Sequence, residues 1–262
     1  IGRTTLSRSI NAFIKSSPIT YVVDQRLATV DSDRQADRKF TELPDLQGVI
    51  QSDEWIAKWN KVSERAQKLI GSMDGWNEAV IARTIAATIP DGTALFVSSS
   101  RPIRDLEGFA HPRSGVHTYA NRGLAGIDGN ISTALGVAYG HKATIAVLGD
   151  LSFLHDLTGL INKEEINCRF IVINNDGGGI FSTLPQRGVN GFETVFGTPH
   201  GLNPAAIAQA MGVQAKQITS LKELVAEVKA PISGVSVVVC DVPDRESNAE
   251  TLKKVVEDLS SI

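Results

Sequence analysis

The sequence contains little cysteine, no large excess of charge of either sign and no long hydrophobic run. Two cysteines, Cys168 and Cys240, occur among 262 residues, each within a short apolar stretch. Such cysteines are typical of buried free thiols in a reducing compartment. The formal net charge of −3 offers no positive field for nucleic acid, and apolar runs such as residues 232–240 are too short to cross a bilayer. No signal segment opens the chain, so we expect a cytoplasmic protein that binds no nucleic acid and is not an integral membrane protein.

The sequence also lacks the short motifs of several enzyme classes. No pair among the five histidines has the spacing of metal ligands, which argues against a zinc site. Neither a GxSxG nor a Walker sequence occurs, and the GxGxxG that a dinucleotide-binding module requires after its first strand is missing. Among the histidines, His200 in FGTPHG is a candidate for a local role near a binding loop.

Regular alternation of predicted strands and helices begins at residue 76. Strands are predicted at 93–97, 116–120, 144–149, 168–173 and 234–241, and the main helices at 77–89, 131–140, 152–162, 204–211, 220–229 and 247–260. A long loop at 174–202 and a short segment near Val213 interrupt the pattern, and loops of that length are usually functional. Apolar runs without alternation suit strands that are buried on both faces. The predicted fold class is therefore α/β, with a three-layer, doubly wound, mostly parallel sheet.

The first 60 residues do not continue this pattern. One helix at 6–14 and one strand at 19–24 are too few to close a core. We therefore expect residues 1–60 to be the C-terminal part of a middle α/β domain, 61–75 to be a connector helix, and 76–262 to be the main domain. Because the chain begins with Ile1 rather than Met and opens on a helix-like stretch, we expect it to be a fragment of a longer protein.

Two strand ends carry the polar residues of greatest interest. TIAVLGD closes on Gly149 and Asp150, and FIVINNDGGGIF opens its polar run at Asn174 and Asn175. The 25 positions between Asp150 and Asn175 (175 − 150) fit one strand–helix–strand unit, so in a parallel sheet the two ends would be neighbours, about 4.8 Å apart. Each segment alone could be an N-cap or a plain glycine-rich turn. Together, a carboxylate, an amide and a glycine-rich backbone favour a site for Mg²⁺ and a diphosphate.

A Gly-Asp at one strand end and an Asn-Asn at the next resemble the signature of thiamine-diphosphate enzymes. Three blocks narrow the resemblance: ANRGLAGIDGNISTALG (120–136), GDLSFLHDLTGL (149–160) and NNDGGGIFSTLP (174–185) are similar to the MenD family. These are the 2-succinyl-5-enolpyruvyl-6-hydroxy-3-cyclohexene-1-carboxylate (SEPHCHC) synthases. Leu151 stands where many thiamine enzymes have glycine, which favours this subfamily. The resemblance covers about residues 76–240 and identifies them as the diphosphate-binding domain.

The resemblance implies that thiamine diphosphate and Mg²⁺ (or Mn²⁺) are the cofactors. The metal ligands would be Asp150, Asn175 and the carbonyl of Gly177. Ile127 would pack against the thiazolium ring of the cofactor. The full set of implied cofactor-binding residues is Ala125, Gly126, Ile127, Gly149, Asp150, Leu151, Asn175 and Gly177.

The resemblance further implies decarboxylation of 2-oxoglutarate and 1,4-addition of the succinyl semialdehyde carbanion to isochorismate, giving SEPHCHC in menaquinone biosynthesis. Both substrates are dianions, and arginine binds carboxylates in a bidentate way. Arg104 and Arg122 are therefore predicted to bind them, with Ser100 as a hydrogen-bond donor, whereas the neighbouring Arg101 is expected to be exposed. An apolar wall around the substrates would be formed by Ile180, Phe181 and Leu184.

No residue of this chain is predicted to be catalytic. In the family, the activating glutamate lies in an N-terminal domain of the partner subunit, and no glutamate here stands in such a motif. We therefore expect this chain alone to be inactive, and the active protein to self-associate as a homodimer or tetramer with the N-terminal domain of another subunit. Two alternatives stay open. One is an acetolactate synthase-like thiamine carboligase or decarboxylase, against which the two arginines argue; the other is a noncatalytic nucleotide-binding module.

Overall fold

The structure, a computed structural model, describes residues 8–25, 36–45, 52–161 and 165–262. The chain forms two compact units, Ile1–Val62 and Ser63–Ile262. None of the helices within the described ranges is long and apolar enough to cross a membrane. The assignment of the first unit to the end of a middle domain stays a prediction.

The first unit contains short elements that only partly follow the sequence prediction. Helix α1 spans Arg8–Ser16 and strand β1 spans Tyr21–Val23, close to the expected helix and strand, although residues 6 and 7 of the expected helix lie outside the described residues. Strand β1 pairs in parallel with β2, Arg38–Phe40, which the sequence analysis did not predict. Helix α2 spans Asp53–Ser72, so the division between the two units falls within it.

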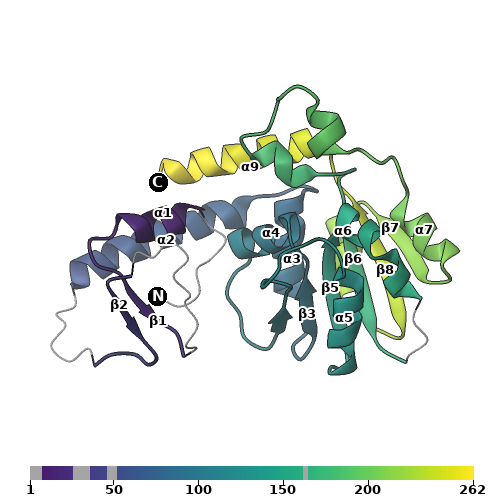
Figure 1. Cartoon of the computed structure of the whole chain (residues 1–262), viewed down its shortest axis with the longest axis horizontal. Coiled ribbons are helices and arrows are strands. Elements are labelled where there is room, and N and C mark those ends of the chain that lie inside the picture. Colours follow the sequence, from purple (N-terminus) through teal and green to yellow (C-terminus); the bar gives the residue numbers. More distant parts are fainter. Residues whose placement is uncertain (1–7, 26–35, 46–51, 162–164) are drawn as a thin grey trace. The chain divides into compact units, whose positions relative to one another are not determined.

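The second unit is built on a six-stranded sheet in the order β4-β3-β5-β6-β8-β7 (Figure 1). Every pair of neighbouring strands in this sheet is parallel, which confirms the predicted α/β class. The strands are β3 Ala94–Val97, β4 His117–Tyr119, β5 Thr144–Gly149, β6 Cys168–Asn174, β7 Gln214–Ile218 and β8 Val235–Asp241. The segment predicted near Val213 is thus followed by the edge strand β7.

The helices of the second unit lie close to their predicted positions, with two corrections. They are α3 Glu78–Thr88, α4 Arg101–Phe109, α5 Asn130–Tyr139, α6 Asp150–His155, α7 Pro204–Ala210, α8 Leu221–Lys229 and α9 Arg245–Ser260. The single helix predicted at 152–162 is wrong, because α6 ends at His155 and a separate 3-10 turn, η1, spans Leu157–Leu160. The predicted loop at 174–202 contains two helical turns, η2 (Gly179–Thr183) and η3 (Glu193–Gly197).

Two apolar cores cover the two faces of the sheet. On the first face, Leu95, Val97 and the residues in register with them pack against α3, α4 and α8. On the second face, Phe96, Leu148 and their neighbours pack against α5, α6 and α7. Successive residues of each central strand therefore face opposite cores, as a sheet buried on both sides requires. Cys168 and Cys240 are buried free cysteines in these cores, as predicted.

The connections that follow the neighbouring strands β3 and β5 run to opposite faces of the sheet. The chain leaves β3 toward β4 through α4 on the first face, and it leaves β5 toward β6 through α6 on the second face. Since β3 and β5 are neighbours, their carboxyl ends carry loops that run in opposite directions. Open α/β sheets bind their ligands at such a point. Ser98 follows β3 there, and Asp150 follows β5.

Candidate functional site

The register of β5 and β6 places the two polar strand ends together. Gly149, the last residue of β5, pairs with Ile173 of β6, so Asp150 and Asn175 both lie just beyond the paired segment. The N–H of Gly177 donates a 2.9 Å hydrogen bond to Oδ2 of Asp150. The backbone that follows β6 therefore contacts the carboxylate that follows β5.

Asp150 is a buried carboxylate held by hydrogen-bond donors from three segments. Asp150 is only 2% exposed to solvent. Oδ1 accepts from the N–H of Leu151 at 2.7 Å, and Oδ2 accepts from Gly177 and, at 3.3 Å, from Nε2 of His200. A carboxylate offers about four acceptor positions, so these three donors leave room for a further partner.

His200 is a site residue whose position the sequence analysis did not establish. Its Nδ1 accepts from the N–H of Leu202 at 3.0 Å, which assigns the proton of the neutral ring to Nε2, facing Asp150. The hydrogen bond to Asp150 raises the pKa of His200, against the lowering effect of burial. Asp176 holds this loop in place, because its Oδ1 accepts from the N–H groups of His200 and Gly201 at 2.9 and 2.8 Å.

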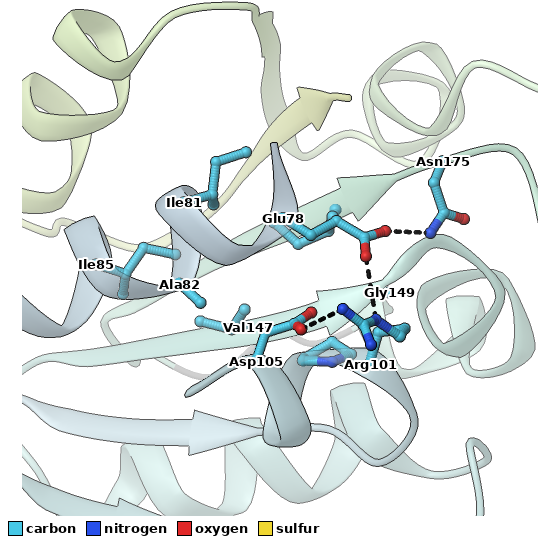
Figure 2. Close-up of a pocket in the computed structure, with 11 residues that line it drawn as sticks. Glu78, Ile81, Ala82, Ile85, Arg101, Asp105, Val147, Gly149 and Asn175 are labelled. Carbon is cyan, nitrogen blue, oxygen red and sulfur yellow. Dashed lines mark hydrogen bonds and ion pairs between the residues drawn. The ribbon is translucent and has the colours of Figure 1, made fainter. Parts of the chain in front are cut away.

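Asn175 presents one satisfied and one unsatisfied end of its amide to the buried site. Its Nδ2 donates a 2.5 Å hydrogen bond to Oε1 of Glu78 (Figure 2). Its Oδ1 is buried and has no hydrogen-bond partner among the described residues. Buried polar atoms in folded proteins nearly always have partners, so this oxygen is suited to an additional ligand.

Glu78, Arg101 and Asp105 form a buried ion triad beside Asn175 (Figure 2). Nε of Arg101 donates to Oε2 of Glu78 at 3.1 Å, and Nη2 of Arg101 donates to Oδ1 of Asp105. The three residues are 5%, 9% and 4% exposed, so the expectation that Arg101 is exposed is wrong. The cause is its position on the first turn of α4, which directs it toward α3.

Burial controls the ionisation of this triad. Desolvation, with a contribution from the negative charge of Glu78, outweighs the attraction of Arg101 and raises the pKa of Asp105 to about 7. Burial lowers the pKa of Arg101, but the two adjacent carboxylates outweigh this effect and the net shift is upward. A cavity of about 20 Å³ adjoins the triad and also borders Gly149 and Asn175. Because of these pKa shifts, Arg101 keeps its positive charge, whereas Asp105 can gain a proton near neutral pH.

The segment predicted to line the cofactor contacts the start of α6 through one residue. The carbonyl of Ile127 accepts a 3.0 Å hydrogen bond from Oγ of Ser152, and Ile127 is partly buried. Ala125 and Gly126 are exposed. The structure thus brings Ile127 near the Asp150 strand end and leaves its two neighbours accessible.

The arginines predicted to bind substrate lie near the end of β3. Nη1 of Arg104 donates a 2.7 Å hydrogen bond to the carbonyl of Ser100, and Nη1 of Arg122 lies 3.4 Å from Oγ of Ser99. Ser100 has a φ of 74°, an uncommon conformation for a residue with a side chain. Both guanidinium groups are therefore close to the Ser99–Ser100 turn. The hydrogen bond predicted from Ser100 to a substrate stays a prediction.

The predicted apolar wall is formed around the turn η2. Ile180, Phe181 and Leu184 are all partly buried. The ring of Phe181 lies 5.2 Å from that of Phe196, which joins η2 to η3. These residues combine packing under the loop with partial exposure, so their role toward a substrate stays a prediction.

The family of this chain follows from a match to its second unit. Residues 105–242 match the family model described as thiamine pyrophosphate enzyme, C-terminal TPP binding domain. The chain belongs to the thiamine pyrophosphate enzyme family. The matched residues include Asp150, Asn175 and Gly177, and the family supports thiamine diphosphate as the cofactor.

Similarity to curated members of the thiamine pyrophosphate enzyme family confirms the narrower resemblance. The chain is 37% identical to the SEPHCHC synthase of Thermobifida fusca (strain YX) over 225 residues, covering 81% of this chain and 41% of that protein. It is 32% identical to the same enzyme of Bacillus cytotoxicus over 273 residues, covering 97% and 46%. A solved structure of benzoylformate decarboxylase from Polynucleobacter necessarius overlaps 63% of this chain and 33% of its own, at 18% identity and a TM-score of 0.49. The chain spans less than half the length of these curated relatives.

Proposed function

We propose that this chain is the diphosphate-binding part of a SEPHCHC synthase. The observation that carries the proposal is the buried, unpartnered Oδ1 of Asn175 next to the Asp150 strand end, in a chain similar to named SEPHCHC synthases. A hard cation accounts for an amide oxygen that lacks a protein donor.

Asp150, Asn175 and the carbonyl of Gly177 are proposed to hold Mg²⁺ or Mn²⁺. Mg²⁺ favours oxygen ligands and usually completes its octahedron with phosphate oxygens and water. The described residues contain no group of three or more His, Cys, Asp or Glu that could hold a metal, and the proposed ligand set differs from such a group because it has one carboxylate, one amide oxygen and one carbonyl oxygen. The carbonyl of Gly177 accepts one hydrogen bond, from Gly179, and its second lone pair can serve the metal.

The backbone at Gly177 passes close to the end of η3. Gly177 has a φ of 127°, and a Cβ built on it would lie 2.2 Å from the carbonyl oxygen of Gly197. Only glycine fits this position. Gly149, Leu151, Ala125, Gly126 and Ile127 are proposed to complete the cofactor-binding surface.

Thiamine diphosphate, when bound, supplies the electron sink for decarboxylation of a 2-oxo acid. The residues of this chain would bind and orient 2-oxoglutarate and isochorismate for the carbon–carbon bond formation that gives SEPHCHC. Arg104 and Arg122, with Ser100, are proposed to pair with substrate carboxylates. Ile180, Phe181 and Leu184 are proposed to exclude water from the reacting groups. The activating glutamate is proposed to come from the N-terminal domain of another subunit in a homodimer or tetramer.

Calorimetric titration with thiamine diphosphate tests the proposed cofactor site. Binding is expected to require Mg²⁺, and Asp150→Asn is expected to weaken it by at least about tenfold, because the variant loses a charged ligand. NAD serves as the negative control. Tight NAD binding without any response to thiamine diphosphate would overturn the proposal.

A kinetic measurement tests the proposed substrate site in the active enzyme. Arg104→Ala is expected to raise KM for a substrate while the affinity for thiamine diphosphate changes little, because the guanidinium would contact substrate rather than cofactor. An unchanged KM for both substrates would remove Arg104 from the substrate site.

A further inference from the structure

We propose that Glu78 is a positioning residue that fixes the orientation of the Asn175 amide, so that Oδ1 of Asn175 faces the bound metal. This inference rests on the proposed function, because it assigns a role toward the metal that Asn175 would bind. It concerns a residue on helix α3 that lies 97 positions before Asn175 in the sequence.

The polarity of the hydrogen bond decides which way the amide faces. An ionised carboxylate can only accept hydrogen bonds, whereas the two ends of an asparagine amide are a donor and an acceptor. Oε1 of Glu78 therefore takes the Nδ2 end of Asn175, and Oδ1 must face the other way, where it is buried without a partner. If the amide were reversed, two oxygens would oppose each other in a buried site.

Glu78 is itself held so firmly that it can impose this orientation. Its other oxygen, Oε2, accepts from Nε of Arg101 at 3.1 Å, and its backbone N–H lies 3.4 Å from Oδ1 of Asn248. Glu78 is the first residue of α3, which begins after the N-cap Asn77. Rotation of the Glu78 carboxylate would break the contact with the buried Arg101, so the carboxylate is a fixed acceptor.

The backbone of Gly179 also lies close to this amide. A Cβ built on Gly179 would lie 2.4 Å from Nδ2 of Asn175 and 3.4 Å from Oδ1. The absence of a side chain there lets the chain pass close to the amide. Glu78 and the backbone of Gly179 thus both restrict the Asn175 amide, and a ligand that is held in place in this way is typical of a metal site.

A purely structural role for the triad predicts a different pattern. Arg101 could simply be neutralised by Glu78 and Asp105, and Asn175 would then be incidental. In that case, replacing either carboxylate should have a similar effect on the metal site. If Glu78 positions Asn175, the two replacements differ, because only Glu78 contacts the amide.

The test compares Glu78→Gln with Asp105→Asn as matched amide substitutions at the two carboxylates of the triad. Mn²⁺ binding in the presence of thiamine diphosphate is measured by the electron paramagnetic resonance signal of free Mn²⁺. Glu78→Gln is expected to weaken Mn²⁺ binding by about tenfold or more, because an amide can present either a donor or an acceptor to Asn175. Asp105→Asn is expected to change Mn²⁺ binding by less than about threefold, since Asp105 contacts Arg101 rather than the Asn175 amide. Equal losses in the two variants would overturn the positioning role.

A reversed pair provides a rescue experiment. In Glu78→Gln/Asn175→Asp, the side-chain amide at position 78 can donate to a carboxylate at position 175, which leaves the other carboxylate oxygen for the metal. The double variant is expected to bind Mn²⁺ at least about fivefold more tightly than Glu78→Gln alone. Failure of the double variant to recover any affinity would contradict the proposal.

A measurement on the metal-free wild-type chain keeps the proposal testable if the variants fail to fold. The side-chain amide protons of Asn175, assigned from the sequential resonance assignment of the wild-type chain, are expected to include one strongly downfield, slowly exchanging proton, because one N–H donates to the buried carboxylate of Glu78. Two freely exchanging protons at ordinary shifts would overturn the positioning role. A different result would contradict the proposed function itself, namely that the wild-type chain shows no Mn²⁺-dependent binding of thiamine diphosphate.

Discussion

Replacement of Arg101 by methionine removes the cation from the buried triad and leaves two carboxylates without it. Methionine preserves much of the length of the side chain, so the change is mainly one of charge and hydrogen bonding. Glu78 and Asp105 are nearly inaccessible to water, and their bonds to Arg101 cannot be replaced by solvent. Breaking a buried ion pair by removing one partner costs about 3–5 kcal/mol. We expect a loss of this size in the free energy of unfolding of Arg101→Met at pH 8.

The loss of stability in Arg101→Met should become smaller as the pH falls, because Asp105 gains a proton. Its pKa is raised from 3.8 to about 7 in the folded protein, so the folded state binds this proton more tightly than the unfolded state. The stabilising contribution of the protonated group is complete below about pH 3.8 and is lost as the pH rises through about 7. Without Arg101 the folded pKa rises further, because the attraction of the cation is gone. The loss caused by Arg101→Met should therefore be smaller at pH 5.5 than at pH 8, although the contact with Glu78 is still missing.

Urea unfolding at pH 8 and pH 5.5, followed by circular dichroism, measures both effects. Arg187→Met is the matched control, since Arg187 also contacts two carboxylates, Glu246 and Glu250, at 2.5 and 2.6 Å. Those partners are exposed, and exposed ion pairs contribute little to stability. A loss in Arg101→Met no larger than that in Arg187→Met, or a loss independent of pH, would refute the assignment of a buried, poorly solvated triad.

Three further predictions concern Gly177, the two cysteines and Asp105. Gly177→Ala should abolish binding of thiamine diphosphate and lower stability, because its Cβ would overlap the carbonyl of Gly197; calorimetry showing wild-type affinity would contradict this. Cys168 and Cys240 should not react with a thiol reagent in the native protein, since burial raises the pKa of both thiols, that of Cys168 to about 12; rapid labelling without denaturant would show that the core is open. Asp105→Asn should flatten the dependence of stability on pH between 5 and 8, and an unchanged slope in urea unfolding would assign that dependence to other groups.

The central fold could be predicted because its strands are buried on both faces. The apolar runs of β5, β6 and β8 have no polar alternation and are bounded by turn residues. Two of the edge strands were harder to predict, unlike the edge strand β4. β2 (RKF) and β7 (QAKQI) carry charged and polar side chains with mostly exposed positions, as solvent-facing strands do, and this composition resembles a loop.

The end of α6 depends on a contact that no local pattern contains. The carboxylate of Asp156 accepts hydrogen bonds from the N–H and the hydroxyl of Ser132 on α5, at 2.7 and 3.1 Å. The chain breaks the predicted helix at this residue because the tertiary contact replaces continuation of the helix. Sequence periodicity alone continued the helix to residue 162.

The candidate site was predictable only where its residues follow strands. Asp150 and Asn175 stand at strand ends, and a parallel sheet brings such ends together. Glu78 and Arg101 have no such signal, since one begins a helix as acidic residues often do and the other resembles an exposed arginine next to a proline. Their meeting depends on the packing of α3 against α4, which the sequence does not encode in any local motif.

The position of β8 in the sheet has a consequence for synthesis of the chain on the ribosome. Although β8 is the last in chain order of the six described strands of this sheet, it lies between β6 and β7 and pairs with both. Until residues 235–241 have left the ribosome, the inner edges of β6 and β7 have no partner strand within this sheet. Unpaired edges of this kind are prone to association with other chains. A nascent chain that has already made every proposed metal ligand must therefore still await β8 before β6 and β7 are joined in one sheet.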